Sequence, residues 1–538
     1  MKNLDSHHTQ NSTQPVTGPL DAAGSGLNTP STAPVSNNFQ RFSNHLKTAW
    51  PDYLLLGLLL VLGLAAAWLP VDWTRNLKRP AQAPNYAWLN LIYTLVYGGA
   101  AWWLWRSRGA EERFRHKWLA LALLVFLPNL FNIWLRFTSP LTATDPRPLF
   151  GRDADIDLYY HYGLALTQGH WPTTPSGQFA EYPQLSFPFF WLGVVLSGSN
   201  RESFYWIFPL LMTFCQFGAA ASLYGLGLKL GRARPAFLLS AWIAGCPALL
   251  LFGYTRFDAG PTALLLAGVY FAIPGDLTGE KGLAAARRWR RWAWLSGFLL
   301  AAGALVKWLP AVAWPWLAAG YWRSRNWAAL RNFGLASLLG GLVFTLPPLV
   351  INTPAMLYPY KFHGSRRLIG ESFWFLVQTA FFDPTHSTPE KPWGEPPKIV
   401  LGNNWITLAQ LALTGLVFGL TLWRLWSVSE TRPALTGWAA SGMLGVAVFT
   451  LANRIFSPQY LVILLWVWAV ALVLRPVAWR SLLVALAFMT LAAVANFEVY
   501  LLGAYPDIWV RDSVVVFAAS FGLTGWLLWR VLYRPEKN

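Results

Sequence analysis

The stretch WLALALLVFLPNLFNIW, residues 118–134, contains no charged side chain. A helix of this length nearly crosses the hydrocarbon core of a bilayer, which is about 30 Å thick. A second uncharged run, FGLASLLGGLVFTLPPLVI at residues 333–351, is longer, and similar runs recur along almost the whole chain. The sequence therefore predicts an all-α polytopic membrane protein.

The composition indicates the same class. Of the 538 residues, 55% are hydrophobic and 12% are charged, whereas an ordinary soluble domain has roughly 25% charged residues. The formal net charge of +18 comes from Lys and Arg in short clusters between apolar runs. Nucleic-acid-binding proteins gather such charge on one folded face, so no nucleic-acid partner is expected. Cys215 and Cys246 lie within predicted spans, as core residues rather than a disulfide framework.

Basic clusters mark the cytoplasmic side of the membrane, because positively charged loops are retained there. About fourteen spans are predicted, near residues 52–70, 88–105, 118–136, 204–228, 236–252, 259–273, 293–306, 308–322, 332–351, 404–426, 434–452, 458–474, 480–503 and 513–530. When these spans alternate, both termini lie in the cytoplasm, together with the clusters at 106–117, 229–234, 281–291, 323–331, 424–432, 475–480 and 530–537. The count requires that residues 185–198 do not cross, and that residues 292–322 form two helices meeting outside at Lys307 and Trp308.

Acidic residues cluster in the first of two long outer segments, directly after a predicted span. Asp153, Asp155 and Asp157 alternate with other residues, and the segment ends in Glu181-Tyr182-Pro183-Gln184. Carboxylates beside aromatic side chains at a membrane surface can act as a general base or bind a cation. A solvated acidic loop, a calcium-like site and a catalytic base all remain open on the residues alone.

Cationic side chains are also predicted on the outer face, where positive charge is disfavoured in short loops. With the polar residues beside them, they are Arg256, Asp258, Lys307, Lys361, His363, Arg366, Arg367, Arg454, Ser457 and Gln459. Arg and Lys recognise phosphate oxygens through charge-assisted hydrogen bonds. The pattern favours an anion site, with contact to lipid headgroups as the alternative.

Three motifs, in this order, carry a family resemblance. They are Asp157-Leu158-Tyr159-Tyr160 with Gly169 and Glu181-Tyr182-Pro183, then Arg366-Arg367 with Glu371-Ser372-Phe373-Trp374, then Asn453-Arg454-Ile455-Phe456-Ser457-Pro458-Gln459-Tyr460-Leu461. The chain resembles the GT-C membrane glycosyltransferases over about residues 118–475, and more narrowly glycosyltransferase family 87, the polyprenyl-phosphate-mannose-dependent mannosyltransferases. It departs from that family at Gln184, where members usually have a second proline. Two further spans also precede the one that leads into the acidic segment.

Composition, the predicted spans and the resemblance together divide the chain into four predicted parts, of which the polar tail at the start follows from its Ser, Thr, Asn, Gln, Pro and Gly content. Residues 1–46 are a disordered cytoplasmic tail, and residues 47–117 are two additional N-terminal transmembrane helices. Residues 118–475 form a GT-C-like catalytic helical bundle with outer loops at 137–203 and 352–403. Residues 476–538 add C-terminal transmembrane helices and a short tail.

The resemblance also implies an inverting transfer of one sugar, mannose or another hexose or pentose, from a polyprenyl-phosphate donor. The acceptor is a hydroxyl of a glycan, glycolipid or lipid at the outer face of the bacterial cytoplasmic membrane. Asp157 is assigned as the base, with Asp155 as the alternative. The substrate and phosphate contacts are assigned to His363, Arg366, Arg367, Lys361, Arg454, Glu181, Tyr182, Arg256, Asp258 and Gln459. No cofactor and no metal site are expected, because a donor with one phosphate needs a divalent cation less than a nucleotide diphosphate does. A requirement for a divalent cation is left open.

Two other functions stay open at this point. A lipid or sugar transporter or flippase would bind the same molecules without covalent chemistry, but transporters often contain an internal repeat with sites near the bilayer midplane. No such repeat is evident, and the polar residues gather at one face. A transferase of a whole oligosaccharide or of a phospho-group would use similar outer cations.

Overall fold

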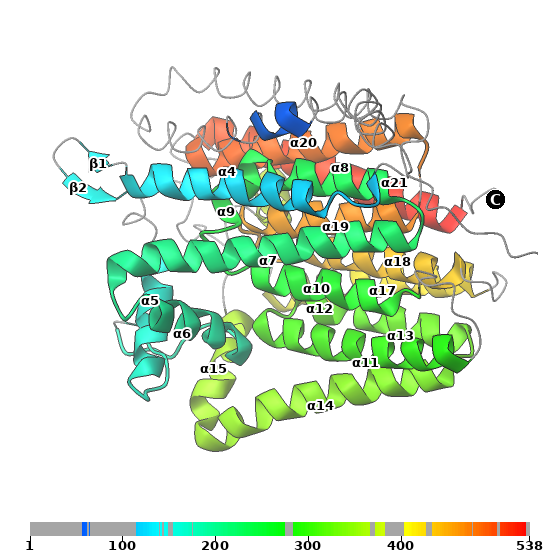
Figure 1. The fold of residues 1–538 in the computed structure, drawn as a ribbon, viewed down its shortest axis with the longest axis horizontal. Helices are drawn as coiled ribbons and strands as arrows, with labels where there is room; N and C mark the ends of the chain where they lie inside the picture. The colour runs from blue at the N-terminus through cyan, green and yellow to red at the C-terminus, as the bar shows by residue number, and fades with distance from the viewer. Residues whose placement is uncertain are drawn as a thin grey trace, which may run out of the picture. The chain divides into compact units, whose positions relative to one another are not determined.

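The computed structural model describes residues 56–61, 64, 114–138, 140–142, 145–148, 154–174, 176–274, 283–365, 372–381, 403–426, 433–475, 477–502 and 506–533. All of them lie in one unit, Asp52–Asn538. Apart from one small hairpin, the regular elements of these residues are helical (Figure 1). The predicted all-α class is therefore confirmed. The predicted tail 1–46 and the span 88–105 lie outside the described residues.

The following helices overlap the predicted spans from residue 118 onward, although some bounds differ. They are α4 (Trp118–Thr138), α7 (Arg201–Lys229), α8 (Ala233–Ala244), α9 (Pro247–Phe252), α10 (Ala259–Ala272), α11 (Leu283–Val306), α12 (Leu309–Val312), α13 (Trp314–Arg323), α14 (Trp327–Ile351), α17 (Asn403–Leu425), α18 (Pro433–Leu451), α19 (Tyr460–Leu474), α20 (Trp479–Leu502) and α21 (Pro506–Tyr533). The predicted break at Lys307 and Trp308 is confirmed, since α11 ends at Val306 and α12 begins at Leu309, but the second part is two helices, α12 and α13, rather than one. The prediction of one continuous helix over 236–252 is wrong. The chain breaks at Gly245 and Cys246, before a proline that cannot donate a helical hydrogen bond.

The two outer segments, predicted as loops, also contain regular structure. The first holds β1 (Pro140–Thr142), β2 (Asp145–Pro148), α5 (Ala154–Thr167), the 3₁₀ turn η3 (Gln184–Ser186) and α6 (Phe187–Leu196), and the second holds α15 (Thr353–Ser365) and α16 (Phe373–Phe381). The strands β1 and β2 pair antiparallel, with Pro140 opposite Pro148. The apolar run at 185–198, predicted as a short segment that does not cross the membrane, contains the ten-residue helix α6.

Five described helical stretches are long and apolar enough to cross a membrane: Trp118–Leu135, Arg201–Lys229, Trp327–Ile351, Asn404–Leu425 and Asp512–Tyr533. Further apolar helices are shorter, among them Ala259–Ala272 and Tyr460–Leu474. The figure of about fourteen crossings thus remains a prediction.

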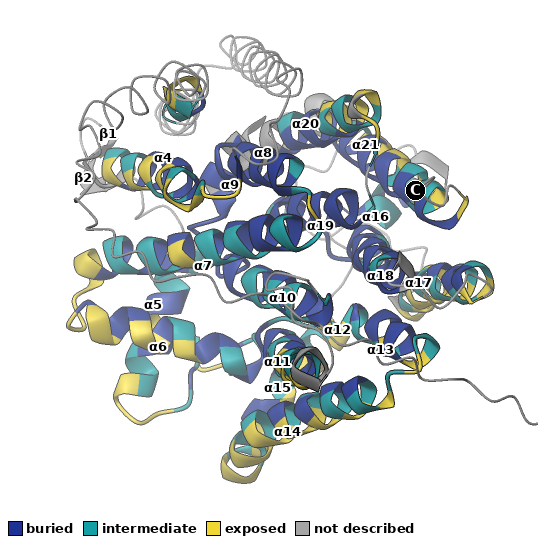
Figure 2. Cartoon of the chain, turned by 45° about the vertical axis from the view of Figure 1, so that its right-hand side comes forward, coloured by how far each residue is buried: buried dark blue, intermediate teal, exposed yellow. Residues whose placement is uncertain are grey.

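The outward face of α14 carries exposed apolar side chains, which indicates that this face contacts lipid. Leu338, Leu342, Leu346 and Val350 follow one another at four-residue intervals, and each is between 40% and 83% exposed. Figure 2 shows such exposed residues along the length of this helix. Contiguous apolar surface of this kind is rare on soluble monomers. The chain is accordingly an integral membrane protein.

Helix α19 differs from α14 in its exposure, because every residue from Leu461 to Leu474 is buried. It contacts α7, α8, α10, α18 and α20 (Figure 2). A helix that is apolar on all sides belongs in the interior of a large protein. Beside it, α7, α10, α11 and α14 form a row of neighbouring helices (Figure 1).

The predicted orientation can be tested by labelling single cysteines in a variant that lacks Cys215 and Cys246. We expect Ser176→Cys, which replaces an exposed residue of the first outer segment, to react with an impermeant reagent in intact cells. Gly279→Cys, in a predicted cytoplasmic loop outside the described residues, should react only after the membrane is opened. The reverse pattern would invert the topology.

Candidate active site

Asp155 and Asp157 belong to the first turn of α5 rather than to an acidic loop. Their negative charge suits the positive end of the helix dipole, which stabilises them there. Successive helical residues are about 100° apart around the axis, so residues two apart point in nearly opposite directions. The two carboxylates therefore lie on different sides of α5 and meet different partners.

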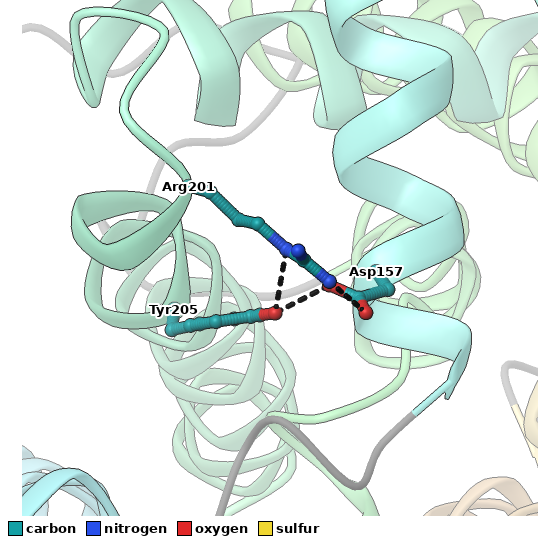
Figure 3. Close-up of polar contacts among 3 residues, drawn as sticks. All are labelled: Asp157, Arg201 and Tyr205. Carbon is teal, nitrogen blue, oxygen red and sulfur yellow. Dashed lines mark hydrogen bonds and ion pairs between the residues drawn. The ribbon is translucent and has the colours of Figure 1, made fainter. Parts of the chain in front are cut away.

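Asp157 faces the beginning of α7, where both of its carboxylate oxygens are occupied (Figure 3). Arg201 Nε donates to Asp157 Oδ1 at 2.9 Å, and Arg201 Nη2 donates to Oδ2. The Tyr205 hydroxyl also donates to Oδ1, while Arg201 Nε lies 3.0 Å from the Tyr205 oxygen. We refer to Asp157, Arg201 and Tyr205 as the α5–α7 clamp. Its geometry fastens one helix to another.

Replacing Asp157 with Asn should have a small effect, since the amide oxygen still accepts one hydrogen bond. Arg201 is 52% exposed, and a solvent-exposed ion pair is typically worth about 0–1 kcal/mol. We expect turnover to fall less than about tenfold, below the usual contribution of a general base, with a slight drop in the midpoint of thermal unfolding. Arg201→Lys serves as the matched control, because it keeps the charge and loses the two-pronged contact. A large loss of turnover in Asp157→Asn, without any change in unfolding, would instead support Asp157 as the base.

Asp155 faces the other way, toward the turn between α9 and α10. Arg256 Nε lies 3.1 Å from Asp155 Oδ2 and donates to Gln459 Oε1 at 2.9 Å. Arg256 is 8% exposed, whereas the Asp155 side chain is 39% exposed. Three segments that are far apart in sequence thus meet at one arginine, and the carboxylate stays accessible.

A second ion pair lies two residues along the same turn. Lys307 Nζ donates to Asp258 Oδ1, and Asp258 is 1% exposed. The ammonium also lies 4.3 Å from the centre of the Tyr460 ring, which is a cation–π contact. Burial, the largest single effect, lowers the pKa of Lys307, but the charge of Asp258, the hydrogen bond to it and the nearby Tyr460 together raise the pKa above its ordinary value. Lys307 therefore remains charged in the break between α11 and α12.

Arg454 holds the end of α15. Its Nη2 donates to the main-chain oxygens of His363 and Gly364, the latter at 2.8 Å, and its Nη1 lies 3.3 Å from Thr407 Oγ1. A basic side chain at the C-terminal end of a helix commonly satisfies the last carbonyls in this way. The sequence predicted a phosphate contact for Arg454, and these contacts describe a helix cap.

His363 lies between two other outer elements. Its Nε2 is 3.0 Å from the main-chain oxygen of Glu181, and its ring meets Trp308 edge-on at 5.0 Å. Lys361 is exposed on the same helix. The cationic end of α15 is thereby joined to the break that carries Lys307. Arg366 and Arg367, the other predicted phosphate contacts, lie outside the described residues.

Tyr182 packs the end of the first outer segment against aromatic rings. Its ring centre lies 4.8 Å from that of Phe257 and 5.8 Å from that of Tyr159. Burial raises the pKa of Tyr159 well above its ordinary value, and the nearby charge of Asp155 raises it further. Burial raises the pKa of Tyr182 as well. Both phenols are neutral, and they form an aromatic support beneath Asp155.

Of the predicted site residues, the structure links Asp155, Arg256 and Gln459 directly, with Asp258 two residues from Arg256. Lys307 was recognised as an outer cation but was not assigned to the site. Arg201 and Tyr205 were not predicted from the sequence. The position of Arg201, just before the span that follows the acidic segment, could have indicated its role. In the ranges that the structure describes, no three His, Cys, Asp or Glu side chains are grouped so as to hold a metal ion.

No family model and no curated protein matches this chain. Its structure is similar to that of ArnT from Cupriavidus metallidurans bound to undecaprenyl phosphate, with 18% identity, coverage of 77% of this chain and 76% of that one, and a TM-score of 0.40. The apo state of the same ArnT gives 16% identity, coverage of 71% and 73%, and a TM-score of 0.38. The apo oligosaccharyltransferase of Archaeoglobus fulgidus gives 12% identity, coverage of 81% of this chain but 57% of that one, and a TM-score of 0.40. These values assign neither a family nor an activity to the chain.

Proposed function

We propose that this protein is an inverting membrane glycosyltransferase that moves a single sugar from a polyprenyl-phosphate donor to an acceptor hydroxyl. The observation that carries the proposal is the group of Asp155, Arg256, Gln459, Asp258 and Lys307, which we call the polar cluster. It gathers four segments around one accessible carboxylate. Charged side chains buried in a membrane protein are expensive and usually serve function.

Asp155 is the base in this proposal. Its carboxylate takes the proton of the acceptor hydroxyl while the hydroxyl oxygen bonds to the anomeric carbon of the donor sugar. The bond between that carbon and the phosphate oxygen breaks, and the electron pair leaves with polyprenyl phosphate. Arg256 holds Asp155 in place through the ion pair at 3.1 Å. Asp157, whose oxygens are both engaged by the clamp, is assigned to positioning α5.

The phosphate is assigned to the cationic end of α15. The charges of the polar cluster cancel, since Asp155 and Asp258 balance Arg256 and Lys307, so the cluster suits neutral hydroxylated groups. His363 and Lys361 lie on α15, and Arg366 and Arg367 follow them in sequence. Charge-assisted hydrogen bonds from these side chains would stabilise the negative charge that develops on the leaving phosphate. The active site is then on the extracytoplasmic face, and the membrane is a bacterial cytoplasmic membrane.

The direct test is cleavage of the donor. The purified protein in proteoliposomes is given polyprenyl-phosphate sugars labelled in the lipid, together with a hydroxylated glycolipid acceptor, and the release of free polyprenyl phosphate is measured. The proposal expects release that depends on the acceptor and is lost in Asp155→Asn. Binding or translocation of every donor without release would indicate a transporter. Transfer of the phosphate together with the sugar would indicate a phospho-group transferase.

A further inference from the structure

Asp258 has one carboxylate oxygen that is not satisfied by the described part of the chain. Its Oδ1 accepts from Lys307, whereas its Oδ2 is buried without a hydrogen-bond partner there. The residue as a whole is 1% exposed. A buried charged oxygen without a donor is costly, so a proton donor from a bound molecule would be stabilising at this point.

The helix that follows Asp258 does not use this oxygen. An aspartate at the start of a helix commonly accepts hydrogen bonds from the first main-chain N–H groups, but Asp258 makes no such cap to α10. Instead the Thr262 hydroxyl donates to the main-chain oxygen of Asp258 at 2.7 Å. The carboxylate is therefore turned away from its own helix and toward the break that carries Lys307.

The side chains around Asp258 indicate which kind of group could donate a hydrogen bond to its Oδ2. Lys307 already neutralises Asp258, so a second cation is not required, and a phosphate would be repelled by the free oxygen. A neutral hydroxyl can donate without adding charge. The rings of Phe257 and Tyr460 lie 5.5 Å and 4.3 Å from the Lys307 ammonium. Phe257 is 1% exposed, whereas Tyr460 is only partly buried and leaves apolar ring surface beside the polar group. Sugars combine hydroxyl donors with apolar C–H faces, which fits both features.

We propose that Asp258 Oδ2 accepts a hydrogen bond from one ring hydroxyl of the transferred sugar, which makes Asp258 a specificity-determining residue. Lys307 is the positioning residue that fixes the carboxylate. The inference rests on the proposed function and adds to it, because it identifies the side chain that recognises a hydroxyl group of the sugar. Asp258 lies only two residues from Arg256, so a sugar bound here would lie beside Asp155, the proposed base.

The experiment compares the parent donor with donors that each lack one ring hydroxyl. Wild-type protein and Asp258→Asn are assayed for kcat/KM with every donor. In the variant the amide oxygen can still accept from Lys307, but an NH2 group replaces the accepting Oδ2. With the parent donor we expect kcat/KM to fall roughly ten- to hundredfold in the variant, the range for a hydrogen bond to a charged group. For one deoxy donor, the kcat/KM of the wild type should fall by a similar factor, whereas the kcat/KM of the variant should fall no further.

Two additional variants separate this role from a general loss of structure. Thr262→Val removes the hydroxyl that bonds the Asp258 main chain, and it should leave the pattern across the deoxy donors unchanged. If Asp258→Asn does not fold, the series is repeated with Asp258→Asn combined with Lys307→Gln, which removes both charges of the buried pair. Equal losses with every deoxy donor in the wild type and in the folded Asp258 variant would overturn the inference while leaving the transferase intact. No transfer from any donor by the wild type would instead overturn the proposed function.

Discussion

Replacing Asp155 with Asn is expected to lower turnover by about a hundredfold to ten-thousandfold, the usual contribution of a general base. Asparagine has nearly the same size and can still accept a hydrogen bond from Arg256, but it cannot take a proton. The rate of polyprenyl phosphate release measures the effect, and donor binding by the same variant should change little. The loss should appear in kcat rather than in KM, because the proton moves only during the reaction.

Asp157→Asn is the matched control for this prediction. It makes the same chemical change two residues away on the same helical turn, but on the side that faces Arg201 and Tyr205. If Asp155→Asn kept nearly full turnover and Asp157→Asn lost it, the base would be Asp157. If both variants stayed active, the carboxylate mechanism would have to be abandoned.

Replacing Lys307 with Met should strongly destabilise the protein. The change leaves the charge of Asp258 buried without its partner, and breaking one side of a buried ion pair costs about 3–5 kcal/mol. We expect a much lower midpoint of thermal unfolding in detergent and a smaller yield of monodisperse protein. Lys307→Arg keeps the charge and should lose far less.

The double variant Asp258→Asn with Lys307→Met isolates the cause. Removing both charges eliminates the uncompensated carboxylate, so stability should recover most of the way toward that of the wild type. A double variant as unstable as Lys307→Met alone would mean that the lysine acts through packing of its aliphatic chain. That outcome would leave the ion pair without the structural role assigned to it here.

Helix positions could largely be predicted because lipid imposes a simple rule on sequence. Long uncharged runs such as residues 333–351 have no stable alternative to a helix in hydrocarbon, and α14 covers that run completely. Lys307 interrupts an otherwise apolar stretch, and the chain breaks there as expected. Helix α5 was missed because its fourteen residues carry acids and tyrosines and are too few to span.

The candidate site was harder to predict than the spans. The sequence identified Asp155, Arg256 and Gln459 as candidates. It could not show that they contact one another, because Arg256 and Gln459, for example, are 203 positions apart and are brought together only by packing of the helices. The choice between Asp155 and Asp157 depends on α5 being helical, since a loop would not fix their opposite directions. The pairing of Asp157 with Arg201 likewise depends on how α5 packs against α7, which one sequence does not specify.

The complete burial of residues 461–474 of α19 has a consequence for which parts of the protein can move. Gln459 and Tyr460 stand at the start of this helix, and its whole length is enclosed by neighbours. Shifting it would disturb close packing on every side, so this side of the polar cluster is expected to stay fixed. If the protein transfers a sugar from a lipid-linked donor as proposed, the movement that admits this donor would fall to peripheral elements. Helix α15 is one such element, since its end is held by hydrogen bonds from Arg454 and by the contacts of His363 with Glu181 and Trp308 rather than by neighbours along its whole length.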